Sequence, residues 1–119
     1  MGIQLQKPRQ IPCGPKCICD GRNICNRKNV TYEITCTICN ETYIGETGRT
    51  IRTRIKEHIK QKESEVFKHF HNTHKIPPEH QLIKWVTIGT SYISALHRKK
   101  HEEILIREHK PKINVIYNN

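Results

Sequence analysis

The sequence is poor in the residues that build a large hydrophobic core. Of 119 residues, 34% are hydrophobic and 6% are aromatic, and the mean hydropathy is −0.73. No segment approaches the run of about 20 apolar residues that a membrane helix requires, so we expect no membrane partner. The chain is long enough for one compact domain, and we expect its small core to depend on a cross-link or a bound metal.

The sequence also lacks a recognisable secretory signal. Residues 1–10 are polar and basic, without the apolar stretch that such a signal contains, so we expect an intracellular protein. Since structural disulfides are rare inside cells, we expect the six cysteines to bind metal. A secreted, disulfide-bonded basic protein is the alternative, and metal analysis under reducing conditions would separate the two.

Acidic residues are scarce relative to basic ones. There are 11 Asp and Glu against 21 Lys and Arg, which gives a formal net charge of +10 and a pI near 9.5. The basic residues are spread along the chain, which indicates a folded basic surface and makes nucleic acid the first partner to consider. Charge alone does not distinguish a ribosomal-type protein from an enzyme.

Apolar alternation predicts three strands. Val30, Tyr32 and Ile34 alternate with polar residues, which is the pattern of a half-buried strand. The run 42–45 predicts a second strand that pairs with the first as a hairpin, with a CxxC pair in the turn. Residues 81–89 predict the third strand.

Helical patterns follow the hairpin. Ile51 and two further isoleucines, each four residues on, predict a helix that begins after Thr50, a suitable N-cap. Residues 64–73 and 91–110 predict two more helices. The last is unusual, because the polar run 97–103 lies where packing residues are expected. The order β-β-α-α-β-α predicts an α+β domain over 29–119, preceded by a cysteine-rich basic extension over 1–28.

Two tyrosines and a helix carry the side chains that matter most for chemistry. Tyr32 and Tyr43 lie eleven residues apart on the paired strands, and Arg54 lies eleven residues beyond Tyr43. His58 follows Arg54 by one helical turn. A strand pair, a turn with glycine and a helix can bring these groups together. Glu102 in the polar run of the last helix completes the set.

This set resembles the GIY-YIG endonuclease superfamily and, at finer grain, the endonuclease domain of Penelope-like retroelements. The second half of the name is present as Tyr43-Ile44-Gly45, whereas Val30-Thr31-Tyr32 keeps only the tyrosine of the first half. The longer match comprises residues 29–36, 43–49 and 54–58, then the stretches from Glu102 and Lys110 that lead to Asn114. The resemblance covers 29–114 and implies a small three-stranded antiparallel sheet flanked by helices.

The resemblance also implies roles for individual residues. Tyr32 would orient or deprotonate the attacking water, with Tyr43 beside it, and Arg54 would hold the scissile phosphate. A phenol titrates near pH 10, so Tyr32 would need a lowered pKa to act as a base. His58 would be a hydrogen-bonding or proton-transfer group. Glu102 would be a ligand for Mg²⁺ or Mn²⁺, and Asn114 would be the closing asparagine of the family.

Each of these residues also has a purely structural interpretation. The two tyrosines could be cross-strand packing partners, and Arg54 and His58 could be solvated helix residues. Glu102 could be a surface acid paired with Arg98, or its neighbour Glu103 could be the ligand instead. Asn114 could be a turn residue after Pro111.

A second group has the spacing of a zinc site. Cys36 and Cys39 offer one half of a tetrahedral shell and His69 with His74 the other, an arrangement similar to the CCHH element of Penelope-like endonucleases. Four protein ligands close the shell, so we expect this zinc to be structural; His71 could replace one of the two histidines. The earlier cysteines form either a second zinc knuckle or part of a disordered basic leader: Cys13, Cys17, Cys19 and Cys25.

Together these features predict a nuclear DNA endonuclease that depends on Mg²⁺ or Mn²⁺ and nicks double-stranded DNA. In a retroelement, such a nick would prime reverse transcription, and a reverse transcriptase would be fused to the domain or act with it. The alternative is a zinc-containing DNA-binding module that has lost cleavage. DNA sequence preference and oligomeric state stay open. We expect phosphate contacts from seven basic residues: Arg49, Arg52, Lys56, Lys60, Arg98, Lys99 and Lys100.

Overall fold

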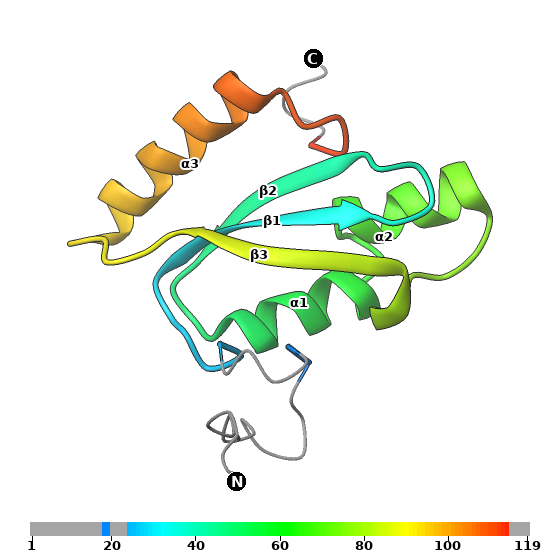
Figure 1. Cartoon of the computed structure of the whole chain (residues 1–119), viewed down its shortest axis with the longest axis horizontal. Helices are drawn as coiled ribbons and strands as arrows, with labels where there is room; N and C mark the ends of the chain where they lie inside the picture. Colours follow the sequence, from blue (N-terminus) through cyan, green and yellow to red (C-terminus); the bar gives the residue numbers. More distant parts are fainter. Residues whose placement is uncertain (1–17, 20–23, 115–119) are drawn as a thin grey trace, which may run out of the picture.

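A computed structural model describes residues 18–19 and 24–114 (Figure 1). A strand hairpin is followed by a helix, a short helical segment, a third strand and a long helix. The elements are β1 (Val30–Cys36), β2 (Thr42–Thr47), α1 (Ile51–Lys60), α2 (Glu65–His69), the π-helix η1 (Phe70–His74), the 3₁₀-helix η2 (His80–Leu82), β3 (Ile83–Gly89) and α3 (Ala95–His109).

The sheet has three antiparallel strands in the order β2-β1-β3, as predicted. Ile34 in the central strand pairs with Tyr43 on one side and with Trp85 on the other. Since side chains alternate between the faces of a strand, these three residues share one face. The sheet with its flanking helices confirms the predicted α+β class.

Three element boundaries differ from those predicted from the sequence. The third strand begins at Ile83, because residues 80–82 form a 3₁₀ turn. The second helical segment continues as a π-helix and ends at Lys75, whose φ of 61° is left-handed. The last helix begins after the N-cap Ser94, four positions later than expected, because Ser91 also has a left-handed φ of 64°.

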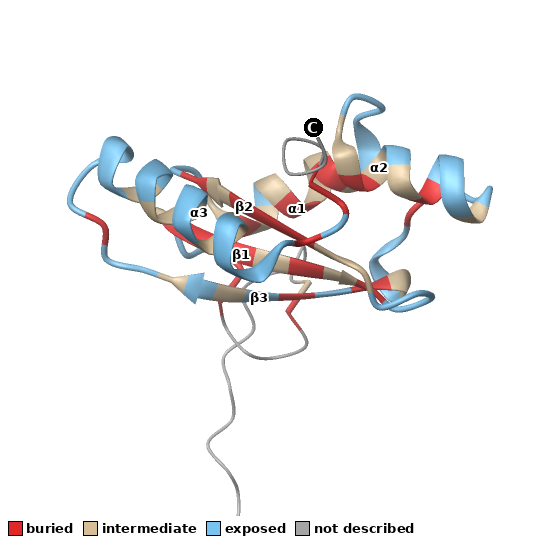
Figure 2. Ribbon diagram, turned by 90° about the horizontal axis from the view of Figure 1, so that it is seen from above, coloured by how far each residue is buried: buried red, intermediate tan, exposed pale blue. Residues whose placement is uncertain are grey.

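The core lies between the sheet and the helices α1 and α2 (Figure 2). From β1, Tyr32 and Ile34 are fully buried, and Ile55 meets them from α1. Phe70 at the start of η1 completes this layer. The isoleucine pattern therefore predicts the correct buried face of α1.

Helix α3 runs over β2 on the other side of the sheet and contributes no buried residue (Figures 1 and 2). Leu96, which the sequence pattern counts among its apolar residues, is 66% exposed, and Ile93 just before the helix is 89% exposed. Polar contacts attach the helix instead. Arg98 donates to Glu46 over 2.5 Å and to Asn29 over 2.8 Å.

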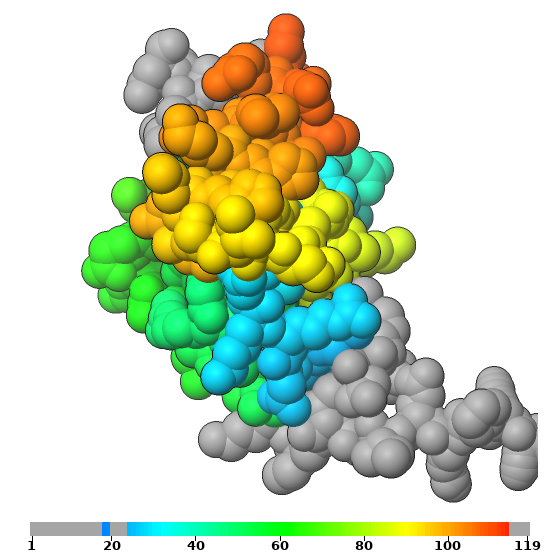
Figure 3. Space-filling view, turned by 90° about the vertical axis from the view of Figure 1, so that its left-hand side faces the viewer, coloured from blue at the N-terminus to red at the C-terminus, as the bar shows by residue number. Residues whose placement is uncertain are grey.

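Tyr92 makes the second attachment of α3. This buried side chain bonds to Nδ1 of His101 over 2.5 Å and to Oγ1 of Thr31 over 2.9 Å. A Cβ at Gly89 would clash with the Tyr92 hydroxyl, so the end of β3 requires glycine. The polar run in this helix is thus the part that docks it. Figure 3 shows α3 and the segment leading into it, in orange and yellow, across this face.

Among the described residues, no helix is both long and apolar enough to span a membrane.

Candidate active site and metal centre

Two phenol rings lie near each other on the side of the sheet that α1 covers. The ring centroids of Tyr32 and Tyr43 are 6.3 Å apart, with an angle of 40° between the planes. Gly45 pairs with Tyr32 in the strand register. A Cβ at Gly45 would lie 2.5 Å from the Tyr32 hydroxyl and 2.8 Å from Cε2 of Tyr43. The glycine of the Tyr-Ile-Gly tripeptide therefore makes room for both rings.

His58 reaches the tyrosines from the buried face of α1. Its side chain is 1% exposed, and its Nε2 lies 2.7 Å from the Tyr32 hydroxyl oxygen. The His58 ring meets the Tyr43 ring edge-on at a centroid distance of 4.9 Å. Burial, and next the charge of Arg54, lower the pKa of His58 to about 3. The imidazole is therefore neutral at physiological pH and has one donor and one acceptor nitrogen.

Arg54 lies between the phenols and an acidic side chain that the sequence interpretation missed. Its positive charge acts on both phenols and opposes the rise in their pKa values, and its Nη1 donates to Oε1 of Glu57 over 3.0 Å. Arg49 donates to both oxygens of Glu57 over 2.7 Å. Glu57 thus bridges the two arginines. The (i, i+3) spacing of Glu57 from Arg54 is the feature of the sequence that could have predicted this ion pair.

Both phenols are held neutral. Burial raises the pKa of Tyr43 to about 12 and that of Tyr32 well above its usual value, and Arg54 opposes the rise in each case. To act as a base near neutral pH, Tyr32 would need a lowered pKa, from nearby cations or from the metal. In the protein without a bound cation, the shift has the opposite sign. Without a further positive charge nearby, Tyr32 therefore keeps its proton at neutral pH.

Glu102 in α3 interacts with this group of side chains through its charge. Its charge acts on Tyr32 and on Tyr43, and Arg54 acts on Glu102 in turn. Burial, followed by the nearby charges of Glu46 and Glu103, raises the pKa of Glu102 to about 7. A partly buried carboxylate beside two others is a fitting ligand for a divalent cation, since the cation would offset their mutual repulsion.

Asn114 closes the domain against β2 through its amide side chain. Its Oδ1 accepts from the backbone N–H of Ile44, and its Nδ2 donates to the carbonyl of the same residue, each over 2.8 Å. Asn114 is 4% exposed. The side chain therefore takes the place of a strand partner beside Tyr43, and this contact goes beyond the alternative of a simple turn residue.

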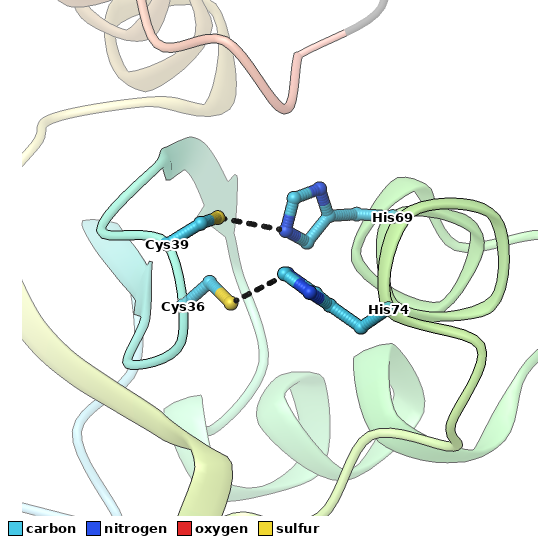
Figure 4. Close-up of side chains that lie close together, drawn as sticks. All are labelled: Cys36, Cys39, His69 and His74. Carbon is cyan, nitrogen blue, oxygen red and sulfur yellow. Dashed lines mark hydrogen bonds between the residues drawn. The ribbon is translucent and has the colours of Figure 1, made fainter.

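Two cysteines and two histidines converge at the hairpin turn (Figure 4). Cys36 Sγ lies 3.4 Å from Nε2 of His74, and Cys39 Sγ lies 3.4 Å from Nε2 of His69. The four ligand atoms all lie within 4.8 Å of one another. Zn–S and Zn–N bonds of about 2.3 and 2.0 Å at tetrahedral angles would separate sulfur from nitrogen by about 3.5 Å. The donor set and its spacing therefore fit zinc, and the alternative ligand His71 is outside the cluster and exposed.

Two of the four earlier cysteines lie in the described part of the chain. Cys19 and Cys25 are fully buried. The backbone N–H of Ile18 donates to Sγ of Cys25 over 3.1 Å, and that of Ile24 donates to Sγ of Cys19 over 3.5 Å. This reciprocal pattern places the two cysteines in neighbouring stretches of chain. The other two, Cys13 and Cys17, lie outside the described residues.

The basic residues expected to contact phosphate differ in their surroundings. The Arg98 side chain is 11% exposed and is engaged with Glu46, so its contacts within the protein are structural. Arg49 is 60% exposed but paired with Glu57. On α1, Lys56 and Lys60 line a surface hollow together with Thr53, Glu57 and Gln61. The other members are half-buried or exposed: Arg52, Lys99 and Lys100.

Comparison with known proteins gives one match. The sequence model of the GIY-YIG catalytic domain matches residues 28–114. No curated protein and no solved structure matches the chain. The matched range contains both tyrosines, the arginine, the buried histidine and the glutamate described above.

Proposed function

The chain belongs to the GIY-YIG catalytic domain family, and from this premise we propose that it is a DNA endonuclease that depends on Mg²⁺ or Mn²⁺. The observation that carries the proposal is the convergence of Tyr32, Tyr43, Arg54 and His58, with Glu102 in electrostatic contact. Hydrolysis of a phosphodiester requires a positioned water and positive charge near the phosphorus. This set of side chains offers both.

Arg54 supplies the positive charge from the protein. Its side chain is 29% exposed, and Glu57 holds one of its nitrogens, Nη1, over 3.0 Å. Holding a flexible guanidinium in place in advance lowers the entropic cost of gripping a phosphate. Arg54 thus binds and orients the scissile group, while Glu57 positions Arg54.

Tyr32 and Glu102 would divide the handling of water and metal. The neutral phenol of Tyr32 hydrogen-bonds the attacking water and fixes its direction of approach. Glu102 would hold the divalent cation, with Glu46 and Glu103 adding negative potential around it. When bound, such an ion neutralises charge on the phosphate and lowers the pKa of a coordinated water.

A plasmid-nicking assay tests this assignment. We expect Glu102→Ala to slow nicking of supercoiled DNA with Mg²⁺ by at least about 100-fold, because a metal ligand accounts for several kcal/mol of transition-state stabilisation. Glu103→Ala changes the adjacent exposed carboxylate, the rival metal ligand, and should slow nicking far less than Glu102→Ala does. Cleavage that survives Glu102→Ala would remove the proposed metal ligand. Binding of DNA without any nicking in Mg²⁺ or Mn²⁺ would favour the alternative, an inactive DNA-binding module.

Zinc is proposed as the structural ion of the cluster at Cys36, Cys39, His69 and His74. The ligands join the hairpin turn to α2 and η1, two parts of the chain that lie far apart in the sequence. Since all four positions are taken by protein atoms, the ion would stabilise the fold and take no part in hydrolysis.

A second zinc ion at Cys13, Cys17, Cys19 and Cys25 is a further part of the proposal. The support is the burial of Cys19 and Cys25 and the N–H groups directed at their sulfurs. Metal analysis tests it: Cys19→Ser with Cys25→Ser should lower the zinc content from two ions per chain to one. An unchanged zinc content would exclude this second site.

The biological setting is proposed on the resemblance to Penelope-like retroelements. The protein would act in the nucleus on double-stranded DNA, together with a reverse transcriptase that extends the nicked end. We propose that the positive charge of +10 draws the domain to DNA, so that binding weakens steeply with salt. The proposed phosphate contacts are Arg49, Arg52, Lys56, Lys60, Lys99 and Lys100, with Arg98 as a structural contact that can also add to the potential.

A further inference from the structure

Ser64 holds the second nitrogen of the buried active-site histidine. The Ser64 Oγ lies 2.7 Å from Nδ1 of His58, while Nε2 of the same ring lies 2.7 Å from the Tyr32 hydroxyl. The three side chains form a continuous chain of hydrogen bonds from the phenol to the serine. Ser64 comes from the N-terminal cap of α2, six positions beyond His58, and none of the family motifs includes it.

The neighbours of Tyr32 determine where its single proton goes. Arg54 carries donors only and its positive charge acts on Tyr32, so the lone pairs of the phenolic oxygen, and not its hydrogen, are favoured on the side of the guanidinium. The Tyr32 hydroxyl then directs its own hydrogen at the remaining partner, Nε2 of His58. Because the neutral imidazole has one hydrogen, that hydrogen lies on Nδ1 and points at Ser64.

The cap geometry of Ser64 agrees with this assignment. Its Oγ accepts the backbone N–H of Val66 over 3.2 Å, which is the ordinary role of an N-cap serine. A hydroxyl oxygen has a second acceptor position, and the Nδ1–H of His58 fills it. One serine oxygen thus begins a helix and orients an imidazole.

We propose that Ser64 is a positioning residue for the nuclease reaction: it fixes His58 as the Nδ1–H tautomer and leaves Nε2 as the acceptor for the Tyr32 proton. This assignment rests on the proposed function for its catalytic meaning, but the tautomer itself is a property of the free protein. With Nε2 unprotonated, His58 holds the phenol so that the lone pairs of its oxygen face Arg54 and the water. The opposite tautomer would direct N–H at the phenolic oxygen and compete with the water for it.

Nitrogen NMR of the His58 ring tests the tautomer directly. Long-range ¹H–¹⁵N spectra distinguish a protonated Nδ1 from a protonated Nε2, and we expect the Nδ1–H form in the unmodified protein. Ser64→Ala and Ser64→Gly both remove the acceptor and should shift the ring toward a mixture of tautomers. Gly is a far better N-cap than Ala, so the pair separates loss of the cap from loss of the His58 partner.

Plasmid nicking with Mg²⁺ supplies the second measurement. Both variants should lose roughly 10-fold or more in kcat with little change in KM, by analogy with residues that orient metal-bound histidines. Ser64→Asp keeps an N-cap acceptor and cannot donate to Nδ1, so it should retain the Nδ1–H form. A matched control is Ser94→Gly, which alters the cap of another helix and should leave the His58 spectrum unchanged.

The outcomes separate this proposal from the proposed nuclease function. An Nε2–H tautomer in the unmodified protein, or an unchanged His58 spectrum in Ser64→Ala and Ser64→Gly, would overturn the role of Ser64. Loss of nicking in Ser64→Ala alone, with Ser64→Gly fully active, would reduce that role to helix capping. A protein that never nicks DNA but shows the expected tautomer shifts would contradict the nuclease function and leave the tautomer assignment standing.

Discussion

The guanidinium of Arg98 in α3 donates to the carboxylate of Glu46 in β2 across 2.5 Å, and both side chains are largely shielded from solvent, at 11% and 18% exposed. This pair attaches the helix that carries Glu102 to β2, the strand that carries Tyr43. Helix α3 has no buried residue of its own. Its position therefore depends on polar contacts to an unusual degree.

Removal of Arg98 should loosen this attachment. We expect Arg98→Ala to destabilise the domain by about 2 kcal/mol, because a shielded carboxylate loses a charged hydrogen-bond partner, and to reduce nicking through displacement of Glu102. Thermal melting and the nicking assay measure the two effects. Lys99→Ala on the neighbouring exposed position should change only the salt dependence of DNA binding. If Arg98→Ala left the melting temperature unaltered and changed only the salt dependence of DNA binding, the main role of Arg98 would be to contact DNA and not to attach α3.

Gly45 should be intolerant of any side chain. Gly45→Ala would place a methyl group against the hydroxyl of Tyr32 and the ring of Tyr43, and overpacking of this kind costs about 1–3 kcal/mol. We expect lower stability together with a greater loss of nicking, since both phenols must move. Gly48→Ala is the control, because its nearest neighbour is the flexible end of Arg98 at 3.2 Å. A Gly45→Ala protein with normal cleavage would show that the rings tolerate displacement.

Cleavage should depend on pH through Glu102, whose pKa is raised to about 7. Only the carboxylate binds the cation, so at limiting Mg²⁺ the nicking rate should rise as the pH passes through about 7. More Mg²⁺ should move the midpoint downward, because the metal competes with the proton. If the pH midpoint of the nicking rate did not change with Mg²⁺ concentration, the titrating group would be one other than Glu102.

The same pKa has a consequence for stability. Because the folded-state pKa lies above the ordinary value of 4.5, the folded protein holds this proton more tightly than the unfolded chain between pH 4.5 and about 7. The contribution of Glu102 to stability is therefore fully present below pH 4.5 and is lost as the pH rises to about 7. Without divalent metal, Glu102→Gln should melt at a higher temperature than the unmodified protein at pH 8, with little difference at pH 4.5.

Zinc removal should unfold the hairpin end of the domain first. Chelation, or His74→Ala, should remove the ion at the cluster with Cys36 and lower the melting temperature by about 10 °C, if the site contributes about 2 kcal/mol in a domain of this size. The exposed neighbour His71 gives the control variant His71→Ala, which should keep its zinc. A His74→Ala protein with full zinc content would show that the ligand set is different.

Apolar patterning predicted the sheet and α1 because their packing follows simple periods. The alternation of Val30, Tyr32 and Ile34 places one face of β1 in the core, and that pattern is legible in the sequence alone. Ile51 and Ile55 do the same for α1. Since the same periods also align Tyr32, Arg54 and His58, the centre of the site could be predicted with them.

The docking of α3 could not be predicted in the same way. Leu96 is apolar but exposed, whereas Arg98, which the sequence analysis expects to contact phosphate, is shielded. Which polar side chains meet depends on tertiary distances that no local period encodes. For the same reason, the sequence placed residue 64 at the start of a predicted helix but gave no sign that Ser64 contacts His58, nor that burial would raise the pKa of Tyr32.

The short stretch from Ser64 to His74 is fastened at both ends. At its beginning the serine grips the imidazole of His58, and at its end His69 and His74 face the sulfurs of the hairpin turn. An ion bound by those sulfurs and by the two histidines would fix the C-terminal end of this eleven-residue segment to the hairpin turn. Loss of the ion would release the C-terminal end of this segment. The contact of Ser64 with His58 would then be disturbed before the domain as a whole unfolds.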